Sequence, residues 1–427
     1  MSETTQFQAP VGTHDVLAPD SARWEGLVAT FADWAHRYGF SLVITPVFED
    51  VGVFNRGIGE ASDVARKEMY VFTDRGERTY ALRPEGTAPI VRAFIQHQPT
   101  TPFKAWYFTP AFRYERPQAG RYRQHHQVGV EVLGTDDPAL DVEVITLAQR
   151  FFEALGLSRF RLLINSLGHA QCRGAYVALL RAHLEGHADQ LCDDHRATWR
   201  ENPLRVLDCK DPACVEVTSR GPMLIDHLCE DCRAHFDAVL AGLARLDVAS
   251  EVSPRLVRGF DYYTRTTFEF VADALDGAQN AIGGGGRYDG LVEQLGGKPT
   301  SGIGFGSGVE RLLLTMAAEG VPVGVARALE VFVVDTTGED AAGVLLDRLR
   351  RAGVASDRAY DQRSMKAQMK VADRSGARWA LLVGPHELAA REVTIRDLRS
   401  ADHEQDQRRV ADQDVVATIL ELRQAEL

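Results

Sequence analysis

The sequence predicts an α+β protein with a strand-rich first domain, a mostly helical insertion and a smaller α/β domain at the C-terminus. Three observations support this. Residues 103–133 show two strand patterns joined by a polar loop, residues 167–246 are charged and helical in character, and strand and helix patterns alternate after residue 331. Since 427 residues suffice for two or three domains, we place one at 1–325, with the insertion at 170–250, and another at 331–427.

The N-terminal elements follow from apolar spacing. Apolar residues recur every three or four positions from about Ser21 to Tyr38, which predicts a helix, and Gly39 suits its left-handed cap. SLVITPVFED predicts a strand that begins at Ser41. The run LRPEGTA precedes a second helix, in which Thr87 can act as the cap and Pro89 lies in the first turn.

The later elements carry many glycines. We expect strand structure from Arg255 to Phe270, a glycine-rich turn at IGGGGRYDG (residues 282–290), and a strand leading into a helix at SGIGFGSGVERLLL. In the last domain, VFVVDTTG and WALLVG predict strands, and helices are predicted near 341–352 and 363–378. The four successive glycines lack the Gly-Lys-Ser/Thr ending of a P-loop, so we predict that they line a binding pocket beside Arg287 and Tyr288.

Composition argues against a membrane-spanning protein and against a disulfide-stabilised secreted protein. Hydrophobic content of 45% and charged content of 25% are typical of a globular protein, and no apolar run reaches the roughly 18 residues of a membrane span. The polar N-terminus has no secretory pattern, so six cysteines favour reduced thiols or metal binding over a disulfide scaffold. We therefore expect a cytoplasmic protein. Its net charge of −12 means that any nucleic-acid contact is local.

Two stretches carry candidate chemistry. In the strand predicted at RQHHQVGVEVLG, Gln127, Gly129 and Glu131 share one face, which leaves a slot for a small ligand or, alternatively, a solvated polar face. The loop before it carries arginines that suit phosphate contacts or simply a solvated hairpin tip. LVRGFDYYT, residues 256–264, places an arginine, an aspartate and two tyrosines within six residues, which is unusual for a core strand.

These stretches resemble the histidyl-tRNA synthetase family of class II aminoacyl-tRNA synthetases. FRYERPQAGRYRQHHQVGVEVLG resembles the second class II motif in its histidyl form, and LVRGFDYYT and GGGGRYDGLVEQLGG resemble the two signatures peculiar to this family. GFSLVITPVFED and GIGFGSGVERLLL resemble the first and third class II motifs. The resemblance covers essentially the whole chain, with one departure at Phe260, where the family usually has leucine.

The resemblance implies a class II antiparallel sheet flanked by helices and a C-terminal anticodon-binding domain. It implies that the chain activates histidine with ATP and Mg²⁺ and transfers it to the 3′-terminal adenosine of its tRNA, as a homodimer that meets around Pro46. Arg258 and Arg113 are the implied catalytic residues, and Asp261 is expected to orient Arg258 or a neighbouring residue. The implied histidine-binding residues are Glu85, Gly86, Thr87, Arg113, Gln127, Glu131, Arg258, Tyr262 and Tyr263. The implied ATP-binding residues are Arg113, Arg121 and Arg311.

The tRNA contacts are expected at two places. The arginine loop, with Arg116, Gln118 and Arg123, would meet the acceptor end, and Gln118 would read the extra 5′ guanosine of histidine tRNAs. Basic residues at spacings of three and four form a stripe on the helix predicted after residue 362, which indicates RNA contact or a solvated face. The stripe comprises Arg363, Lys366, Lys370, Arg374 and Arg378.

The sequence leaves alternatives open for the state of the cysteines and for the function. Cys209, Cys214, Cys229 and Cys232 could form one four-thiolate zinc site, although the first pair has unusual spacing, or they could be reduced structural cysteines. Two other functions share the fold: a non-catalytic histidine-binding regulatory paralogue of histidine biosynthesis, and a synthetase for threonine or proline. The C-terminal domain and the intact RGFDYY signature argue against the first, and Glu131 together with RGFDYY argues against the second.

Overall fold

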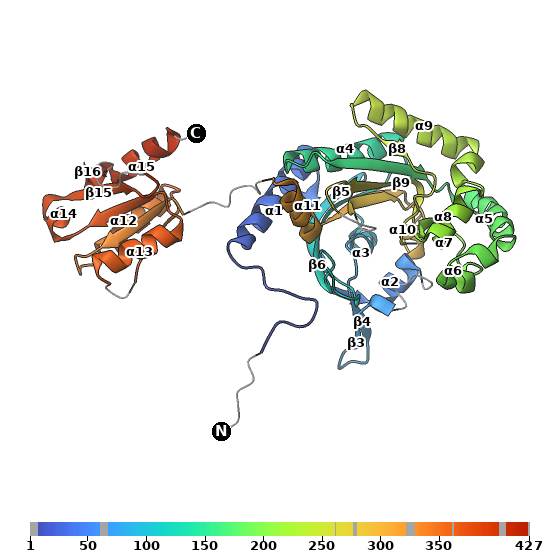
Figure 1. The fold of residues 1–427 in the computed structure, drawn as a ribbon, viewed down its shortest axis with the longest axis horizontal. Helices are drawn as coiled ribbons and strands as arrows, with labels where there is room; N and C mark the ends of the chain where they lie inside the picture. Colours follow the sequence, from blue (N-terminus) through green and yellow to red (C-terminus); the bar gives the residue numbers. More distant parts are fainter. Residues whose placement is uncertain are drawn as a thin grey trace, which may run out of the picture. The chain divides into compact units, whose positions relative to one another are not determined.

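The chain folds into two compact units, Met1–Gly324 and Val325–Leu427, in a computed structural model that describes residues 7–59, 67–260, 262–275, 280–321, 329–360, 363–400 and 407–425. Figure 1 shows the first unit as a large sheet wrapped by helices and the second as a smaller sheet with helices on both faces. The predicted α+β class is confirmed. Within the described residues, no helix is long and apolar enough to cross a membrane.

The first unit is built on an eight-stranded sheet. Its strands, in spatial order, are β1 (Ser41–Leu42), β5 (Phe103–Phe112), β6 (Gln124–Leu133), β11 (Gly302–Gly308), β10 (Ala281–Arg287), β9 (Thr264–Ala272), β7 (Phe160–Ser166) and β8 (Glu251–Val252). The inner pairings are antiparallel, whereas the outer pairs β1–β5 and β7–β8 are parallel. This is the antiparallel sheet expected from the resemblance.

The two faces of this sheet have different roles. The valines of β6 point into a core made with α1 (Asp20–Arg37), α4 (Pro138–Ala154), α9 (Glu230–Arg245) and α11 (Val309–Glu319). The other face meets α3 (Thr87–His97), which packs near α2 (Val51–Ile58) and α10 (Leu291–Gln294). As predicted, Gly39 follows the first helix with a left-handed φ of +78°.

The prediction of one continuous strand at residues 41–50 is wrong, because this segment forms two short strands. Ser41–Leu42 joins the large sheet, whereas β2 (Phe48–Asp50) belongs to a separate small sheet with β4 (Thr79–Leu82) and β3 (Val71–Thr73). Pro46 lies in the break, and a proline cannot donate a hydrogen bond to a strand ladder. The chain therefore changes sheets there instead of running straight on.

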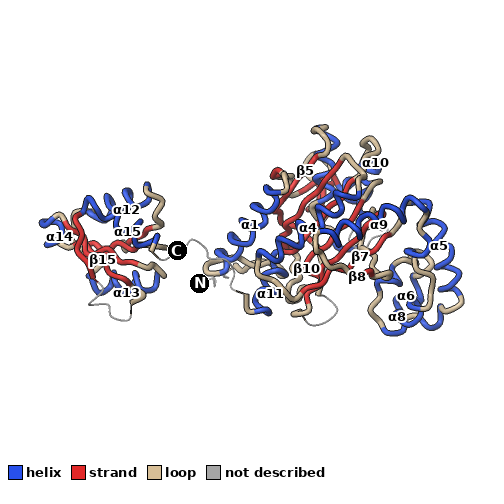
Figure 2. Tube along the Cα trace, turned by 90° about the horizontal axis from the view of Figure 1, so that it is seen from above, coloured by secondary structure: helices blue, strands red, loops and turns tan. Residues whose placement is uncertain are grey.

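The insertion is helical, as predicted. It leaves β7 and runs through α5 (Ala170–Glu185), α6 (Asp193–Thr198), α7 (Arg205–Asp208) and α8 (Pro212–Ser219) before α9 returns to β8. Short 3₁₀ turns, η2 (Ala188–Gln190) and η3 (Leu224–His227), link these helices. Its small core joins the face of the sheet that carries Tyr262 and Tyr263. Figure 2 shows α5, α6 and α8 grouped beyond the end of the sheet.

Two predictions about the glycine-rich region are wrong. Regular strand structure begins at Thr264 and not at Arg255, and IGGGG is an interior strand, β10, and not a turn. Each glycine faces a close neighbour: a Cβ on Gly285 would lie 2.0 Å from the Gly304 carbonyl oxygen, and one on Gly284 would lie 2.8 Å from Arg258 Nη1. Close approach of neighbouring groups, and not turn formation, explains the run.

Alanine at Gly285 should destabilise the protein by about 3 kcal/mol or more, because its clash is with backbone that no rotamer change can relieve. Gly306→Ala, on the adjacent strand, is the matched control, since the added carbon would meet only Tyr107 Oη at an ordinary 3.6 Å. Urea unfolding of both variants would measure the difference. Equal stability of the two variants would contradict this account of the strand.

The second unit is a five-stranded sheet with helices on both faces, which Figure 2 shows. The strand order is β13 (Ser356–Arg358), β12 (Val331–Asp335), β14 (Trp379–Val383), β15 (Glu392–Asp397) and β16 (Gln407–Ala411). Helices α12 (Ala341–Arg351) and α15 (Val415–Gln424) pack on one face and α13 (Met365–Ser375) on the other, while α14 (Pro385–Ala390) precedes β15. Each strand and helix predicted here is present, with α13 shorter at both ends than expected.

Candidate active site

One cavity of about 540 Å³ lies on the α3 face of the large sheet. Its walls come from the start of α3, from β5, β6, β9, β10 and β11, from the start of α11, and from the insertion. Most of the predicted histidine and ATP residues meet there. Those that line the cavity are Glu85, Thr87, Arg113, Arg121, Gln127, Arg258, Tyr262, Tyr263 and Arg311.

Glu85 lies at the start of α3 and is 3% exposed. Its two carboxylate oxygens accept the backbone N–H groups of Thr87, at 2.6 Å, and Ala88, at 2.7 Å. Glu85 therefore caps the helix, and the prediction that Thr87 caps it is wrong. Burial raises the pKa of Glu85, although these two amides act against the increase. A buried carboxylate that still lines the cavity can receive a cationic group such as an ammonium.

Glu131 lies behind the lining, 1% exposed, at the centre of a hydroxyl cluster. Thr87 donates to its Oε1 at 2.7 Å and Tyr288 donates to its Oε2 at 2.5 Å. Burial raises the pKa of Glu131 to about 8, even though both hydrogen bonds lower it. Thr87 and Tyr288, the two hydroxyl donors, line the cavity and thus lie between it and this carboxylate.

Tyr107 occupies the slot that the sequence left between Gln127 and Glu131. It pairs with Gly129 across β5 and β6, and a Cβ on Gly129 would lie 2.4 Å from Tyr107 Oη. A Cβ on Gly86 would likewise lie 2.5 Å from the Tyr107 ring. Both glycines therefore make room for a tyrosine of the protein, and the predicted open slot above Gly129 is wrong. Tyr107 itself forms part of the cavity wall.

Tyr262 and Tyr263 face the same cavity, although neighbours in a strand would point in opposite directions. They precede the first residue of β9, so strand alternation does not apply to them. Their ring centroids lie 4.6 Å apart, and both side chains are buried. The expected role of Asp261 concerns a position outside the described residues.

Arg258 reaches the cavity over Gly284 and pairs with Glu269 of β9 at 2.5 Å. Its guanidinium carbon lies 5.8 Å from the Tyr263 ring centroid. Arg113 enters from the end of β5, with its Nε donating to the Pro84 carbonyl at 2.9 Å. Phe260, the departure from the family pattern, lies beneath Arg113 at 5.6 Å and supplies an aromatic face that leucine lacks.

Two further arginines of the cavity, Arg311 and Arg121, have different surroundings. Arg311 follows the start of α11, and burial lowers its pKa, as does nearby Arg121. Arg121 pairs with Glu115 at 3.0 Å in the loop between β5 and β6. Four arginines, Arg113, Arg121, Arg258 and Arg311, thus line one cavity, a combination suited to a polyphosphate.

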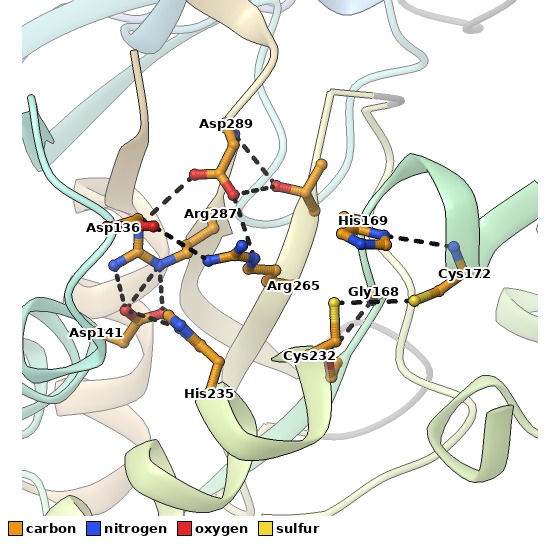
Figure 3. A network of polar contacts seen from close by, with 12 residues as sticks. Asp136, Asp141, Gly168, His169, Cys172, Cys232, His235, Arg265, Arg287 and Asp289 are labelled. Atoms are coloured by element: carbon orange, nitrogen blue, oxygen red, sulfur yellow. Dashed lines mark hydrogen bonds and ion pairs between the residues drawn. The ribbon is translucent and has the colours of Figure 1, made fainter. Parts of the chain in front are cut away.

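Arg287 does not lie beside the pocket, contrary to the prediction. It is fully buried and points away to Asp141 of α4, with an Nη2–Oδ2 distance of 2.7 Å (Figure 3). Its Nη2 also donates to the Asp137 carbonyl at 2.8 Å, and His235 Nε2 lies 3.4 Å from Asp141 Oδ2. Arg287 therefore fastens β10 to the helices behind the sheet, while Tyr288 alone serves the cavity.

The predicted tRNA residues lie outside the cavity. Arg116 and Gln118 are exposed on the β5–β6 loop, whereas Arg123 covers the Tyr114 ring at 4.1 Å. On α13, Lys366, Lys370 and Arg374 are exposed. Arg363 precedes the helix and Arg378 follows it, and Arg378 pairs with Asp397 at 2.6 Å, so the helical stripe is shorter than predicted.

The single four-thiolate zinc site is wrong, because the structure divides the cysteines differently. Cys229 and Cys232 lie with Cys172 and His169, whereas Cys209 and Cys214 lie with Cys192 and His195. The contribution of His169, His195, Cys172 and Cys192 was missed. Spacing along the chain could not show which cysteines meet in the folded insertion.

Other cavity residues were also missed, including Tyr107, Glu269, His125, Asp208 and Lys210. Tyr107 and Glu269 lie within ordinary strand patterns. Asp208 and Lys210 come from the insertion, and only the tertiary structure brings them to the catalytic sheet. Burial lowers the pKa of His125 to about 3, and Arg113 adds to this, so the ring is neutral near pH 7.

Comparison with known proteins agrees with this arrangement. A family profile described as histidyl-tRNA synthetase matches residues 12–312, and one described as an anticodon binding domain matches residues 329–422. The histidine–tRNA ligase of Rhodococcus erythropolis is 50% identical over 409 residues, 95% of this chain and 96% of that relative. The one from Mycobacterium tuberculosis is 50% identical over 412 residues, 94% of this chain and 96% of the relative.

A solved structure extends the agreement to three dimensions. The apo histidyl-tRNA synthetase of S. aureus matches with a TM-score of 0.81 at 34% identity, covering 97% of this chain and 100% of that one. Sequence signatures, sheet topology and relatives thus agree over almost the full length. The chain belongs to the histidyl-tRNA synthetase family.

Proposed function

We propose that this chain is a histidine–tRNA ligase, which joins histidine to ATP as histidyl-adenylate with release of pyrophosphate and then transfers histidine to the 3′-terminal adenosine of its tRNA. One observation carries the proposal: a single cavity adjoins the buried carboxylates Glu85 and Glu131 and is lined by four arginines, Arg113, Arg121, Arg258 and Arg311. The carboxylates suit the cationic and N–H groups of histidine, and the arginines suit the phosphates of ATP.

The roles follow from position. Glu85, Thr87 and Gln127 hold the α-ammonium, and the tyrosines with Glu131 select the imidazole. Arg113 and Arg258 hold the α-phosphate, and Arg258 stabilises the charge that develops there as the carboxylate attacks. Arg311 and Arg121 hold the rest of the triphosphate. Because positioning and electrostatic stabilisation dominate such reactions, the protein needs no nucleophile of its own.

We further propose Mg²⁺ as the companion of ATP, since it prefers phosphate and carboxylate oxygens and Glu269 and Glu310 line the cavity. A homodimer in the cytoplasm is also proposed. Exposed apolar side chains around Pro46 support such an interface, because Leu42 is 49% and Ile44 is 84% exposed.

The test of the function is histidine-dependent exchange of labelled pyrophosphate into ATP. We expect exchange with histidine and none above background with threonine or proline. Wild-type protein that binds histidine but supports no exchange would refute the enzyme and favour the regulatory alternative. Exchange with threonine or proline in place of histidine would refute the assigned substrate.

Histidine affinity should increase about fivefold between pH 7 and pH 8 if the imidazole N–H is accepted by Glu131. The pKa of that carboxyl is about 8, so it is mostly protonated at pH 7, and the ionised form is the stronger acceptor of an N–H. Titration calorimetry in two buffers would measure the affinity and the proton released. Glu131→Gln should remove the pH dependence, and an unchanged dependence would disprove direct contact.

Removal of positive charge from α13 should weaken the binding of tRNA but should not change the activation of histidine with ATP. Lys366→Ala with Lys370→Ala should raise the KM for tRNA severalfold and reduce its salt dependence, because each phosphate contact releases bound counterions. Histidine-dependent pyrophosphate exchange should be unchanged. The matched control is Arg351→Ala on α12, which is exposed and pairs with Asp347 of the same helix at 2.9 Å. An equal effect of the control would show that the α13 position is not specific.

A further inference from the structure

The six cysteines of the chain are free thiols arranged in two groups, each with one histidine. Within each group the candidate ligand atoms all lie within 4.8 Å of one another. The first group joins the start of α5 to the start of α9, where the insertion leaves the sheet and returns to it. The second joins α6, the end of α7 and α8, inside the insertion.

The first group consists of His169, Cys172, Cys229 and Cys232, which Figure 3 shows in part. Cys172 Sγ lies 3.9 Å from Cys232 Sγ, and Cys229 Sγ lies 3.7 Å from His169 Nε2. Gly168 turns the chain just before with a φ of +56°, which brings His169 towards the sulfurs. The Nδ1 of His169 accepts a long 3.4 Å contact from the Cys172 amide, which metal binding at Nε2 would displace.

The second group consists of Cys192, His195, Cys209 and Cys214. Cys192 Sγ lies 3.9 Å from Cys209 Sγ and 3.1 Å from His195 Nδ1. The Cys192 amide donates to Cys214 Sγ at 3.3 Å. Cys209 lies between Asp208 and Lys210, two residues of the cavity wall, so this group also holds the part of the insertion that reaches the active site.

The two sulfur–sulfur distances of 3.9 Å and the Cys229–His169 distance of 3.7 Å are close to those of a metal tetrahedron, whereas the Cys192–His195 distance of 3.1 Å is shorter. With zinc–sulfur bonds of about 2.3 Å and zinc–nitrogen bonds of about 2.0 Å, neighbouring sulfurs stand about 3.8 Å apart and sulfur and nitrogen about 3.5 Å apart. A disulfide would need about 2.05 Å. Backbone amides also donate to the sulfurs, from Asp231 and Cys232 to Cys229 and from Asp211 to Cys209. Such hydrogen bonds orient and stabilise metal-bound thiolates.

We propose that the insertion carries two structural zinc ions, each held by three cysteine thiolates and one histidine. Four protein ligands close each site, so neither ion has an open position for catalysis. The insertion has only a small apolar core, and small units of this kind are commonly stabilised by metals. One ion would fasten the insertion to the sheet, and the other would fix the segment that carries Asp208 and Lys210.

The test is the zinc content of the full-length protein, without a polyhistidine tag, after exhaustive dialysis. We expect two zinc ions per chain, released by a mercurial reagent that blocks the thiols. X-ray absorption at the zinc edge should show an average of three sulfurs and one nitrogen per ion. Folded protein that holds fewer than two zinc ions per chain would overturn the proposal.

Substitutions of the two histidines test whether each group of ligands holds one zinc ion. His169→Asn and His195→Asn should each lower the zinc affinity of one site by at least tenfold, whereas His169→Cys and His195→Cys should retain both ions, since zinc also accepts four thiolates. His227→Asn is the matched control, an exposed histidine of the same insertion outside both groups. Loss of zinc in the control, or two tightly bound ions in the double His169→Asn/His195→Asn variant, would overturn the assignment.

Discussion

Arg258→Ala should lower histidine-dependent pyrophosphate exchange by about 10²–10³-fold, because it removes a fixed cation from the place where charge develops on the α-phosphate. Glu269 holds the guanidinium at 2.5 Å, and Gly284 leaves room for it where any side chain would collide. Arg258→Lys should recover only part of the rate, since an ammonium lacks the planar fork that contacts two oxygens.

The control is Arg161→Ala, which removes an arginine of the same sheet that does not line the cavity. Arg161 lies on β7, is half exposed and pairs with Glu251 and Asp273 at the surface. Exchange by this variant should equal that of the wild type. If Arg258→Ala kept more than about a tenth of the wild-type rate with its fold intact, the catalytic role of Arg258 would be refuted.

Asp141→Asn should lower the free energy of unfolding by about 3–5 kcal/mol, because it removes the nearest carboxylate of the buried Arg287 guanidinium and leaves the partly exposed Asp289, at 3.6 Å, as a weaker countercharge. Both side chains of this pair are fully buried. Burial alone would raise the pKa of Asp141, but His235 and Arg287 together hold it below its usual value. This stabilisation is therefore present above about pH 4 and is lost only as the pH falls further.

Denaturant unfolding at pH 7 would measure the loss. Asp136→Asn is the matched control, because Asp136 is 70% exposed and lies 3.9 Å from Arg265 at the edge of the same network (Figure 3). The control should change stability by less than about 0.5 kcal/mol, as exposed ion pairs do. A loss of similar size in both variants would show that burial of the pair is not what matters.

Local patterns predicted much of the architecture. The first helix, the β5–β6 hairpin, the helical insertion and the alternating second unit agree with expectation, because apolar spacing and capping residues act over short stretches of chain. The family signatures predicted the residues of the cavity for the same reason, since each lies within a short contiguous motif. Glu85, Arg113, Arg258 and Arg311 come from four separate motifs and meet in one place.

Predictions that depended on distant neighbours were less accurate. Glycine allows a turn and a crowded strand equally, so the nature of β10 depends on Gly304 and Arg258, which are remote in sequence. Gly129 indicated close approach, yet the approaching group is Tyr107 and not a ligand. The cysteines were grouped by spacing, whereas folding pairs Cys172 with Cys232 across the whole insertion.

The strand of four glycines limits which amino-acid substitutions the protein can tolerate. Gly283, Gly284 and Gly285 each face a different neighbour, namely Phe305, Arg258 and the Gly304 backbone, so no single compensating change elsewhere could admit side chains at all three. Evolution therefore has little freedom along this strand. In a saturation mutagenesis screen for growth, these codons should form an uninterrupted block in which nearly every amino-acid change is eliminated, including changes to alanine.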